Sequence, residues 1–181
     1  MTASLPSGVS AELAELLERL HRALAERHQS VAVAESLTGG LLAAALTSTP
    51  GASASFRGGV VAYATDLKAR LVGVSETVLA EQGPVAAQVA LELARGVRSR
   101  LSASWGVGVT GVAGPQPQDG KAVGTVFLAV VGPGAGRGDQ PEDCIESVSE
   151  LNLRGDRNMI RVQVVEQAVA LLAGAVTHVT G

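Results

Sequence analysis

One short stretch, residues 34–40 (Ala-Glu-Ser-Leu-Thr-Gly-Gly), places a candidate nucleophile beside two glycines. It follows an apolar run at 31–35 that is typical of a buried strand, and a helix is expected over 39–48. Glycines let the backbone turn tightly near a ligand, and the first N–H groups of a helix attract negative charge. Ser36 therefore lies where an oxyanion or a phosphate would be stabilised. The simpler alternative is that Ser36 or Thr38 only caps the helix.

Lysine is rare in this chain, and one of its two lysines lies close to the only tyrosine. Lys68 and Lys121 stand against twelve arginines, and Lys68 follows Tyr63 by five residues. A desolvated lysine can lose its proton, whereas arginine stays charged. Ser36 and Lys68, with Tyr63 nearby, would supply the nucleophile and base of an amidase. The alternatives are an ordinary exposed Lys68 and a core aromatic at Tyr63.

Candidate site residues follow three expected strands: Ser36 the first, Tyr63 and Lys68 the second, and Thr110 the third. Ligands bind at the carboxyl ends of strands in open α/β sheets, so these residues are expected to converge. None of the three histidines lies near an expected strand end, and Gly-x-Ser-x-Gly is absent, which argues against a Ser–His–Asp hydrolase. The loop at 111–120 is rich in glycine and proline but lacks the Gly-Lys-Ser/Thr of a P-loop.

Two arginines open the last expected helix, after an N-capping Asp156. Arg157 and Arg161 are four residues apart and would share one helix face, where they could clamp a phosphate. The alternative is a solvated surface pair. Glu35, next to the nucleophile, is expected to hydrogen-bond to the loop rather than take part in the chemistry.

The alternation of apolar strands and amphipathic helices predicts an α/β fold, a three-layer α/β/α sandwich. Its sheet is expected to be mixed but mostly parallel, with about five strands and one antiparallel strand. The connection at 132–143 carries no helix, which predicts one antiparallel pair between strands four and five. Strands are expected at 31–35, 58–64 (buried), 104–110, 124–131 and 144–151, and helices at 10–28, 39–48, from 66, and at 75–81, 85–101 and 156–176.

Composition narrows the function further. The chain has 181 residues and is 46% hydrophobic, which predicts one domain over 1–181 with a flexible start at 1–9. A net charge of −3 and 2% aromatic residues argue against direct nucleic-acid contact. Cys144 is the single cysteine, so no internal disulfide is expected. We see no signal peptide and no membrane-spanning run, which predicts a cytoplasmic protein.

Several ordered motifs together resemble the CinA C-terminal domain family, over most of the chain from Val31 to the last helix. They are Ala34-Glu35-Ser36-x-Thr38-Gly39-Gly40, Phe56-x-Gly58-Gly59-Val60-Val61-x-Tyr63 with Lys68, Val109 to Pro115, Val123 to Val126, and Gly155-Asp156-Arg157 with Ile160-Arg161. Leu37 stands where the family usually has cysteine, Ala64-Thr65 replaces Ser-Asn, and 116–119 replaces a more glycine-rich segment. We expect a stand-alone form, without the larger N-terminal domain that some relatives carry.

The resemblance implies a homo-oligomeric amidohydrolase that converts nicotinamide mononucleotide to nicotinate mononucleotide and ammonia, without metal or other cofactor. It implies that Ser36 is the nucleophile and that Lys68 and Tyr63 assist proton transfer. The substrate-binding residues that it implies are Thr38, Gly39, Gly40, Thr110, Gly111 and Arg157. Two other functions stay open: a pyridine-nucleotide-binding module that has lost catalysis, suggested by the altered segment 116–119, and a competence-associated partner protein.

Overall fold

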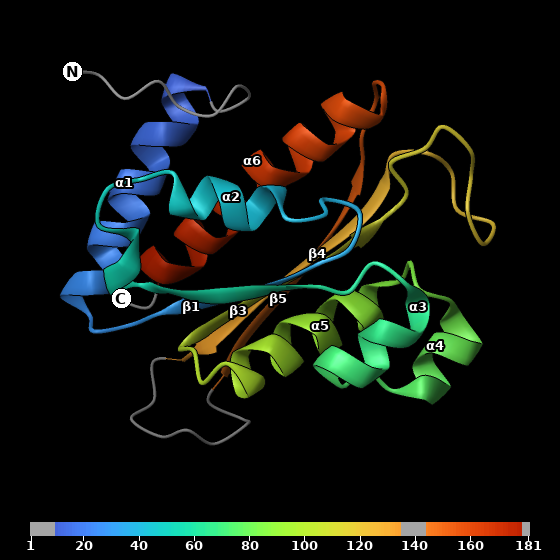
Figure 1. Ribbon diagram of the computed structural model, residues 1–181, viewed down its shortest axis with the longest axis horizontal. Helices are drawn as coiled ribbons and strands as arrows, with labels where there is room; N and C mark the ends of the chain where they lie inside the picture. The colour runs from blue at the N-terminus through green and yellow to red at the C-terminus, as the bar shows by residue number, and fades with distance from the viewer. Residues whose placement is uncertain (1–9, 135–143, 179–181) are drawn as a thin grey trace.

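The computed structural model describes residues 10–134 and 144–178, and the expected flexible start at 1–9 lies outside them. A five-stranded sheet of order β2-β1-β3-β4-β5 forms the middle layer (Figure 1). Its strands are β1 (Val31–Glu35), β2 (Phe56–Val61), β3 (Trp105–Gly111), β4 (Thr125–Pro133) and β5 (Cys144–Asn152). β1 is parallel to β2 and β3, and β4 is antiparallel to both β3 and β5. The mixed α/β sandwich is confirmed. The single antiparallel strand, β4, lies between two parallel strands and forms two antiparallel pairs, whereas one pair was expected.

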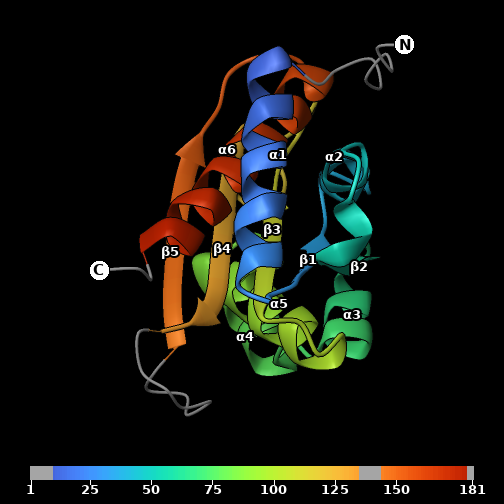
Figure 2. The same ribbon diagram turned by 90° about the vertical axis from the view of Figure 1, so that its left-hand side faces the viewer.

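Helices cover both faces of the sheet (Figure 2). On one face lie α1 (Ala11–Glu26), α2 (Leu41–Thr47) and α6 (Arg157–His178), whose leucines and valines share a core cluster with the apolar side chains of β1 and β3. On the other face lie α3 (Thr65–Leu67), its π-helical continuation η2 (Lys68–Val72), α4 (Glu76–Gln82) and α5 (Ala87–Arg100). A 3-10 turn, η1 (Ala52–Ala54), precedes β2.

Two sequence expectations about apolar segments need correction. The second strand runs over Phe56–Val61 rather than 58–64, and its burial alternates because β2 is an edge strand, not a buried one. The segment Arg157–Thr177 of α6 is long and apolar enough, by length and composition alone, to cross a membrane. Its apolar residues nevertheless pack into the core cluster against α1 and the sheet, so α6 is a core helix.

Glycines bring α5 unusually close to its neighbours. A Cβ atom at Gly108 of β3 would lie 2.1 Å from the carbonyl oxygen of Ala90, and one at Gly96 of α5 would lie 2.0 Å from that of Val72. No side chain fits at those separations, so glycine is what allows α5 to rest on β3 and η2 to rest on α5. This packing places η2, and with it Lys68, against the carboxyl end of the sheet.

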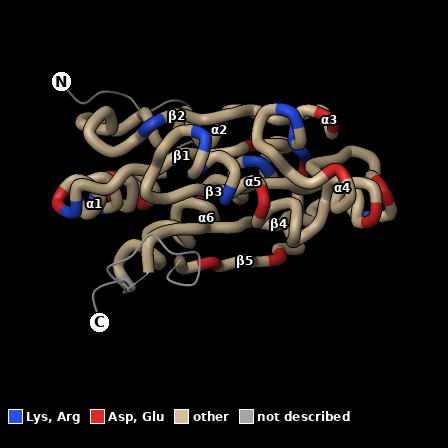
Figure 3. Tube along the Cα trace, turned by 90° about the horizontal axis from the view of Figure 1, so that it is seen from below, with Lys and Arg blue, Asp and Glu red and all other residues tan. Residues whose placement is uncertain are grey.

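Acidic and basic positions are spread over the view in Figure 3, including its middle near β3 and α5. The central strands β3 and β4 contain no Asp, Glu, Lys or Arg. Only two charged side chains, Glu35 and Lys68, are at most 1% exposed among the described residues. Burial of a charge is costly, so both positions require a physical reason.

Candidate active site

Glu35 is buried because it caps α2. Its carboxylate accepts hydrogen bonds from the backbone N–H groups of Gly40 (3.0 Å), Leu42 (3.1 Å) and Ala43 (2.8 Å). Charge-assisted bonds to three otherwise unpaired N–H groups, at the positive end of a helix, compensate the carboxylate for lost water. The expected bond between Glu35 and the loop is thus confirmed. The cap is neither Ser36 nor Thr38, and Glu35 takes the helix N–H groups that were expected to face a ligand of Ser36.

Lys68 lies beside the candidate nucleophile. Its Nζ is 2.9 Å from the Ser36 Oγ and donates a second bond of 2.8 Å to the carbonyl oxygen of Ala62. The lysine side chain is 1% exposed, and desolvation lowers its pKa to about 8 from an ordinary value of 10.5. Among the described residues no carboxylate forms an ion pair with Lys68. The sequence alternative of an exposed lysine is therefore wrong.

A small cavity of about 90 Å³ opens above this pair. Its walls come from the ends of β1 and β3, from the start of η2, from the loops before α5 and after β3, and from α6. Of the sequence candidates it brings together Ser36, Tyr63, Lys68, Thr110, Gly111 and Arg157. Thr38, Gly39 and Gly40 do not line it. The convergence expected at the carboxyl ends of three strands is confirmed for all four residues concerned, Ser36, Tyr63, Lys68 and Thr110.

Thr110 can act only as an acceptor toward a molecule in this cavity. Its hydroxyl donates its single hydrogen to the carbonyl oxygen of Pro84, at 2.6 Å, because a carbonyl cannot donate. The lone pairs of the Thr110 oxygen remain for a donor. An amide NH2 group is such a donor, and a negatively charged oxygen is not.

Tyr63 and Arg157 form the outer part of the site rather than its base. Arg157 donates to the Tyr63 hydroxyl (2.6 Å) and to the carbonyl oxygen of Gly114 (2.7 Å), and Tyr63 is 55% exposed. Neither residue is hydrogen-bonded to Ser36 or Lys68. The alternative of a core aromatic is wrong for Tyr63, and the tyrosine and arginine together define the mouth of the cavity.

The two glycines after Ser36 are not placed as oxyanion donors. The Gly39 N–H bonds to the Ser36 carbonyl oxygen at 3.1 Å, and the Gly40 N–H bonds to Glu35. Thr38 is fully buried, and its hydroxyl has no hydrogen-bond partner among the described residues. Both glycines have positive φ angles, 59° and 98°, so their structural role is to turn the chain between β1 and α2.

Sequence reasoning missed several residues of the cavity wall. Leu37 lies beside Ser36 and was considered only for its side chain, while Gln116 and Gln118 come from the segment that departs from the family pattern. The backbone N–H of Leu37 and the position of the loop that carries Gln116 and Gln118 cannot be recognised from a single sequence. Arg161 was expected to share a phosphate with Arg157, but it turns to the Leu37 and Thr38 carbonyl oxygens instead.

No histidine among the residues whose side chains are described lines this cavity. His21 is buried between α1 and α2, where its ring nitrogens bond to the Ser55 hydroxyl (2.6 Å) and the Leu46 carbonyl oxygen (2.8 Å). Desolvation lowers the pKa of His21. Within 10–134 and 144–178, no group of three or more His, Cys, Asp or Glu residues is placed to hold a metal ion.

Comparison with known proteins identifies the family of this chain. The CinA C-terminal domain family model matches residues 13–176. A CinA-like protein of Frankia casuarinae is 48% identical over 149 residues, which are 82% of this chain and 32% of that protein. A CinA-like protein of Anaeromyxobacter is 45% identical over 161 residues, 87% of this chain and 36% of that protein. The chain thus spans about a third of the curated relatives that it matches.

Solved structures show the same fold over nearly the whole chain. The competence/damage inducible protein CihA from Agrobacterium tumefaciens has a TM-score of 0.84 at 33% identity, covering 95% of this chain and 99% of that one. A competence-damaged protein (CinA) superfamily protein from Escherichia coli has a TM-score of 0.77 at 26% identity, covering 96% and 95%. The chain belongs to the CinA C-terminal domain family.

Proposed function

We propose that this chain hydrolyses the carboxamide of nicotinamide mononucleotide, with Ser36 as nucleophile and Lys68 as general base. The observation that carries the proposal is the 2.9 Å contact between a buried Lys68 Nζ and the Ser36 Oγ, at a lysine pKa of about 8. A lysine with that pKa is neutral in a useful fraction of molecules near neutral pH, so it can accept the serine proton.

The first half of the reaction follows from these contacts. Neutral Lys68 takes the Ser36 hydroxyl proton as the serine oxygen attacks the amide carbon, and the carbonyl oxygen becomes an oxyanion. The Lys68 ammonium then returns the proton to the amide nitrogen, which leaves as ammonia, and an ester to Ser36 remains. In the second half Lys68 takes a proton from water as the water oxygen attacks the ester carbon, and it returns that proton to the departing Ser36 oxygen. The acid product then loses its remaining proton to solvent and leaves as a carboxylate.

The Leu37 N–H is the donor best placed for the oxyanion. The carbonyl of the Ser36–Leu37 peptide points into the turn, toward the Gly39 N–H, so the N–H of this trans peptide points out of it. Leu37 lines the cavity beside Ser36, and its N–H has no acceptor among the described residues. The N–H after a serine nucleophile has this role in α/β-hydrolases as well.

The acceptor character of Thr110 supports an amide substrate. A carboxamide presents an NH2 donor to the Thr110 oxygen, whereas the product presents a carboxylate that this oxygen would repel. Arg157, at the mouth, is the proposed partner of the substrate phosphate, and Tyr63 holds it in place through the 2.6 Å contact. Tyr63 thereby acts on binding rather than as the proton carrier first expected.

Ammonia release from nicotinamide mononucleotide, measured for wild type and Ser36→Ala, tests the proposal. The variant should lose essentially all turnover. Ser48→Ala is the matched control, because Ser48 lies at the opposite end of α2 and bonds only to the Ala45 carbonyl oxygen. Equal activity of Ser36→Ala and wild type would remove Ser36 from the mechanism.

A wild-type protein that binds the mononucleotide tightly in calorimetry, without turnover at any pH from 6 to 10, would favour the binding-module alternative. The walls formed by Gln116 and Gln118 are where such a loss would arise. The competence-associated role is supported only by the names of relatives. A cytoplasmic location, expected from the sequence, and a homo-oligomeric state, implied by the family resemblance, are part of this proposal. Sedimentation would measure the oligomeric state.

A further inference from the structure

Arg161 lies outside the cavity, on the opposite side of the nucleophile turn. It comes from α6 one helical turn after Arg157, and it is half-buried. Its Nε donates to the Leu37 carbonyl oxygen (3.1 Å) and its Nη2 to the Thr38 carbonyl oxygen (2.8 Å). Among the described residues no carboxylate is paired with it. A guanidinium that keeps its charge and binds two successive carbonyls holds the turn that carries Ser36.

These contacts begin a continuous chain of peptide hydrogen bonds that ends at the cavity. Arg161 binds the carbonyl of the Thr38–Gly39 peptide, and the N–H of that peptide donates to the Ser36 carbonyl oxygen at 3.1 Å. The Ser36 carbonyl belongs to the peptide whose N–H is that of Leu37. Each link polarises the next, because a carbonyl that accepts a stronger bond makes the N–H of its peptide a stronger donor. The positive charge therefore acts on the Leu37 N–H through two peptide groups.

We propose that Arg161 is a positioning residue, which orients and polarises the Leu37 N–H and fixes the Ser36 turn without touching the substrate. This inference rests on the proposed amide hydrolysis. Arg161 would stabilise the transition state, because the oxyanion is absent from the bound substrate. Arg157 differs, since it would bind the phosphate in the ground state as well. Loss of Arg161 should therefore lower kcat and leave KM almost unchanged.

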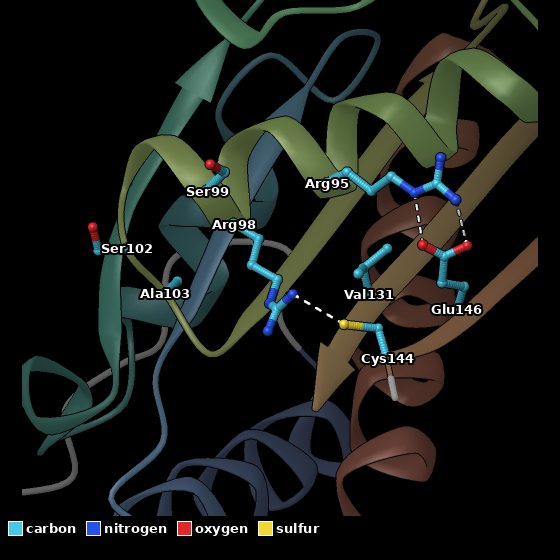
Figure 4. A pocket seen from close by; sticks show the side chains of 8 residues that line it. All are labelled: Arg95, Arg98, Ser99, Ser102, Ala103, Val131, Cys144 and Glu146. Atoms are coloured by element: carbon cyan, nitrogen blue, oxygen red, sulfur yellow. Dashed lines mark hydrogen bonds and ion pairs between the residues drawn. The ribbon is translucent and has the colours of Figure 1, made fainter. Parts of the chain in front are cut away.

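The test compares Arg161→Gln and Arg161→Lys with Arg98→Gln. Arg98 is a matched control, because it too is half-buried and bonds to a backbone carbonyl, that of Ser104 (2.9 Å), but at the other end of the sheet (Figure 4). Arg161→Gln should lose about 10²-fold in kcat, the scale of a misplaced catalytic group or a weakened oxyanion donor. Arg161→Lys keeps the charge but cannot bind both carbonyls as a fork, so its loss should be smaller, about tenfold. Arg98→Gln should leave kcat unchanged.

Three readouts separate positioning from other roles. KM should stay within about twofold, and the pH midpoint of turnover should stay near 8, because Lys68 keeps its burial. Amide hydrogen exchange over residues 36–42 should be faster in Arg161→Gln than in wild type or Arg98→Gln. A raised KM with unchanged kcat, a displaced pH midpoint, or a kcat loss equal to that of Arg98→Gln would each overturn the inference.

Amide hydrogen exchange also tests the role of Arg161 independently of the proposed reaction. If the wild-type protein released no ammonia from the mononucleotide, the proposed function would be wrong. Unchanged amide hydrogen exchange over residues 36–42 in Arg161→Gln would instead show that Arg161 does not hold the Ser36 turn. Faster exchange over residues 36–42 would support the contact between Arg161 and the turn, whether or not the protein releases ammonia. Should Arg161→Gln fail to fold, Arg161→Lys carries the same kcat, KM and exchange comparison.

Discussion

Two of the cavities among the described residues differ in size and in the state of their charges. The larger, of about 790 Å³, lies at the opposite end of the sheet and is lined by Arg95, Arg98, Cys144 and Glu146 among others (Figure 4). The smaller, of about 90 Å³, contains Ser36 and Lys68. In the larger cavity Arg95 forms a bidentate pair with Glu146, both contacts at 2.6 Å, and this pair raises the pKa of Arg95. In the smaller one burial lowers the pKa of Lys68 to about 8.

We infer from this difference that the basicity of a buried cation follows from its uncompensated charge, not from the volume of the cavity. A cation beside a carboxylate is stabilised in its charged form and has no tendency to exchange protons near pH 7. A cation buried without an anion is destabilised, and that free energy appears as basicity. The five predictions below test the contrast between the compensated and the uncompensated charge, in order of decreasing effect.

Lys68→Arg should have the largest effect. Arginine keeps the positive charge but cannot give up its proton, so turnover should fall by roughly 10²–10⁴, the contribution of a general base. Affinity for the mononucleotide should change little. Steady-state ammonia release and calorimetry measure the two quantities. Lys121→Arg is the control, because Lys121 stacks on the Phe127 ring (5.8 Å to its centroid), a contact that arginine also makes. Near-normal turnover of Lys68→Arg would place the base elsewhere.

The buried lysine should also make stability depend on pH. The folded-state pKa is about 8 and the unfolded value about 10.5, so between these values the unfolded chain binds more protons and stability rises with pH. Lys68→Met lacks this term. The difference in unfolding free energy, wild type minus Lys68→Met, should be constant below pH 7 and then increase by about 3 kcal/mol up to pH 10.5, at 1.36 kcal/mol per pKa unit. Urea unfolding at several pH values measures it, and a flat difference would contradict the lowered pKa.

Thr110→Val should reduce kcat/KM by about ten- to a hundredfold. It removes the acceptor for the amide NH2 and leaves the buried Pro84 carbonyl without its donor, a loss of about 1–3 kcal/mol. Thr110→Ser keeps the hydroxyl and should stay close to wild type. Product inhibition by nicotinate mononucleotide distinguishes the two roles of Thr110. If its oxygen repels the carboxylate, Thr110→Val should bind product more tightly than wild type, and weaker product binding would argue that Thr110 donates.

Wild-type turnover should rise with pH through the Lys68 pKa. The neutral lysine is the active form, and with a pKa of about 8 it is roughly a tenth of the population at pH 7. The rate should therefore increase about tenfold between pH 7 and pH 9.5 and then level off. Measurement of kcat under substrate saturation shows this limb without changes in binding. A rate that is flat over this range would mean that proton transfer to Lys68 is not limiting.

The comparison also shows how much of this site a single sequence predicts. Strand ends and the scarcity of lysine were sufficient to select Ser36, Lys68, Tyr63 and Thr110 as neighbours. Arg157 was selected from its helical spacing to Arg161 and from the family resemblance. The N–H donors for the oxyanion were assigned wrongly, because a sequence does not show whether the backbone N–H groups of Gly39 and Gly40 are already hydrogen-bonded. Only the fold shows that Glu35 and the Ser36 carbonyl bind their N–H groups. Burial of Lys68 was also beyond the sequence, because it follows from the tertiary packing of η2, whose Val72 approaches Gly96 of α5 closely.

Glu146→Gln should have the smallest effect. Arg95 and Glu146 are 48% and 32% exposed, so solvent screens their attraction and the pair contributes about 0–1 kcal/mol to stability. The glutamine still accepts one hydrogen bond from Arg95, and the cavity lies away from Ser36, so kcat and KM should remain unchanged. Thermal unfolding and ammonia release measure both. A turnover loss of tenfold or more would mean that the larger cavity communicates with the smaller one through α5, which packs against β5 on one side and against η2 on the other. In that case compensation of a charge would not suffice to separate a passive cavity from an active one.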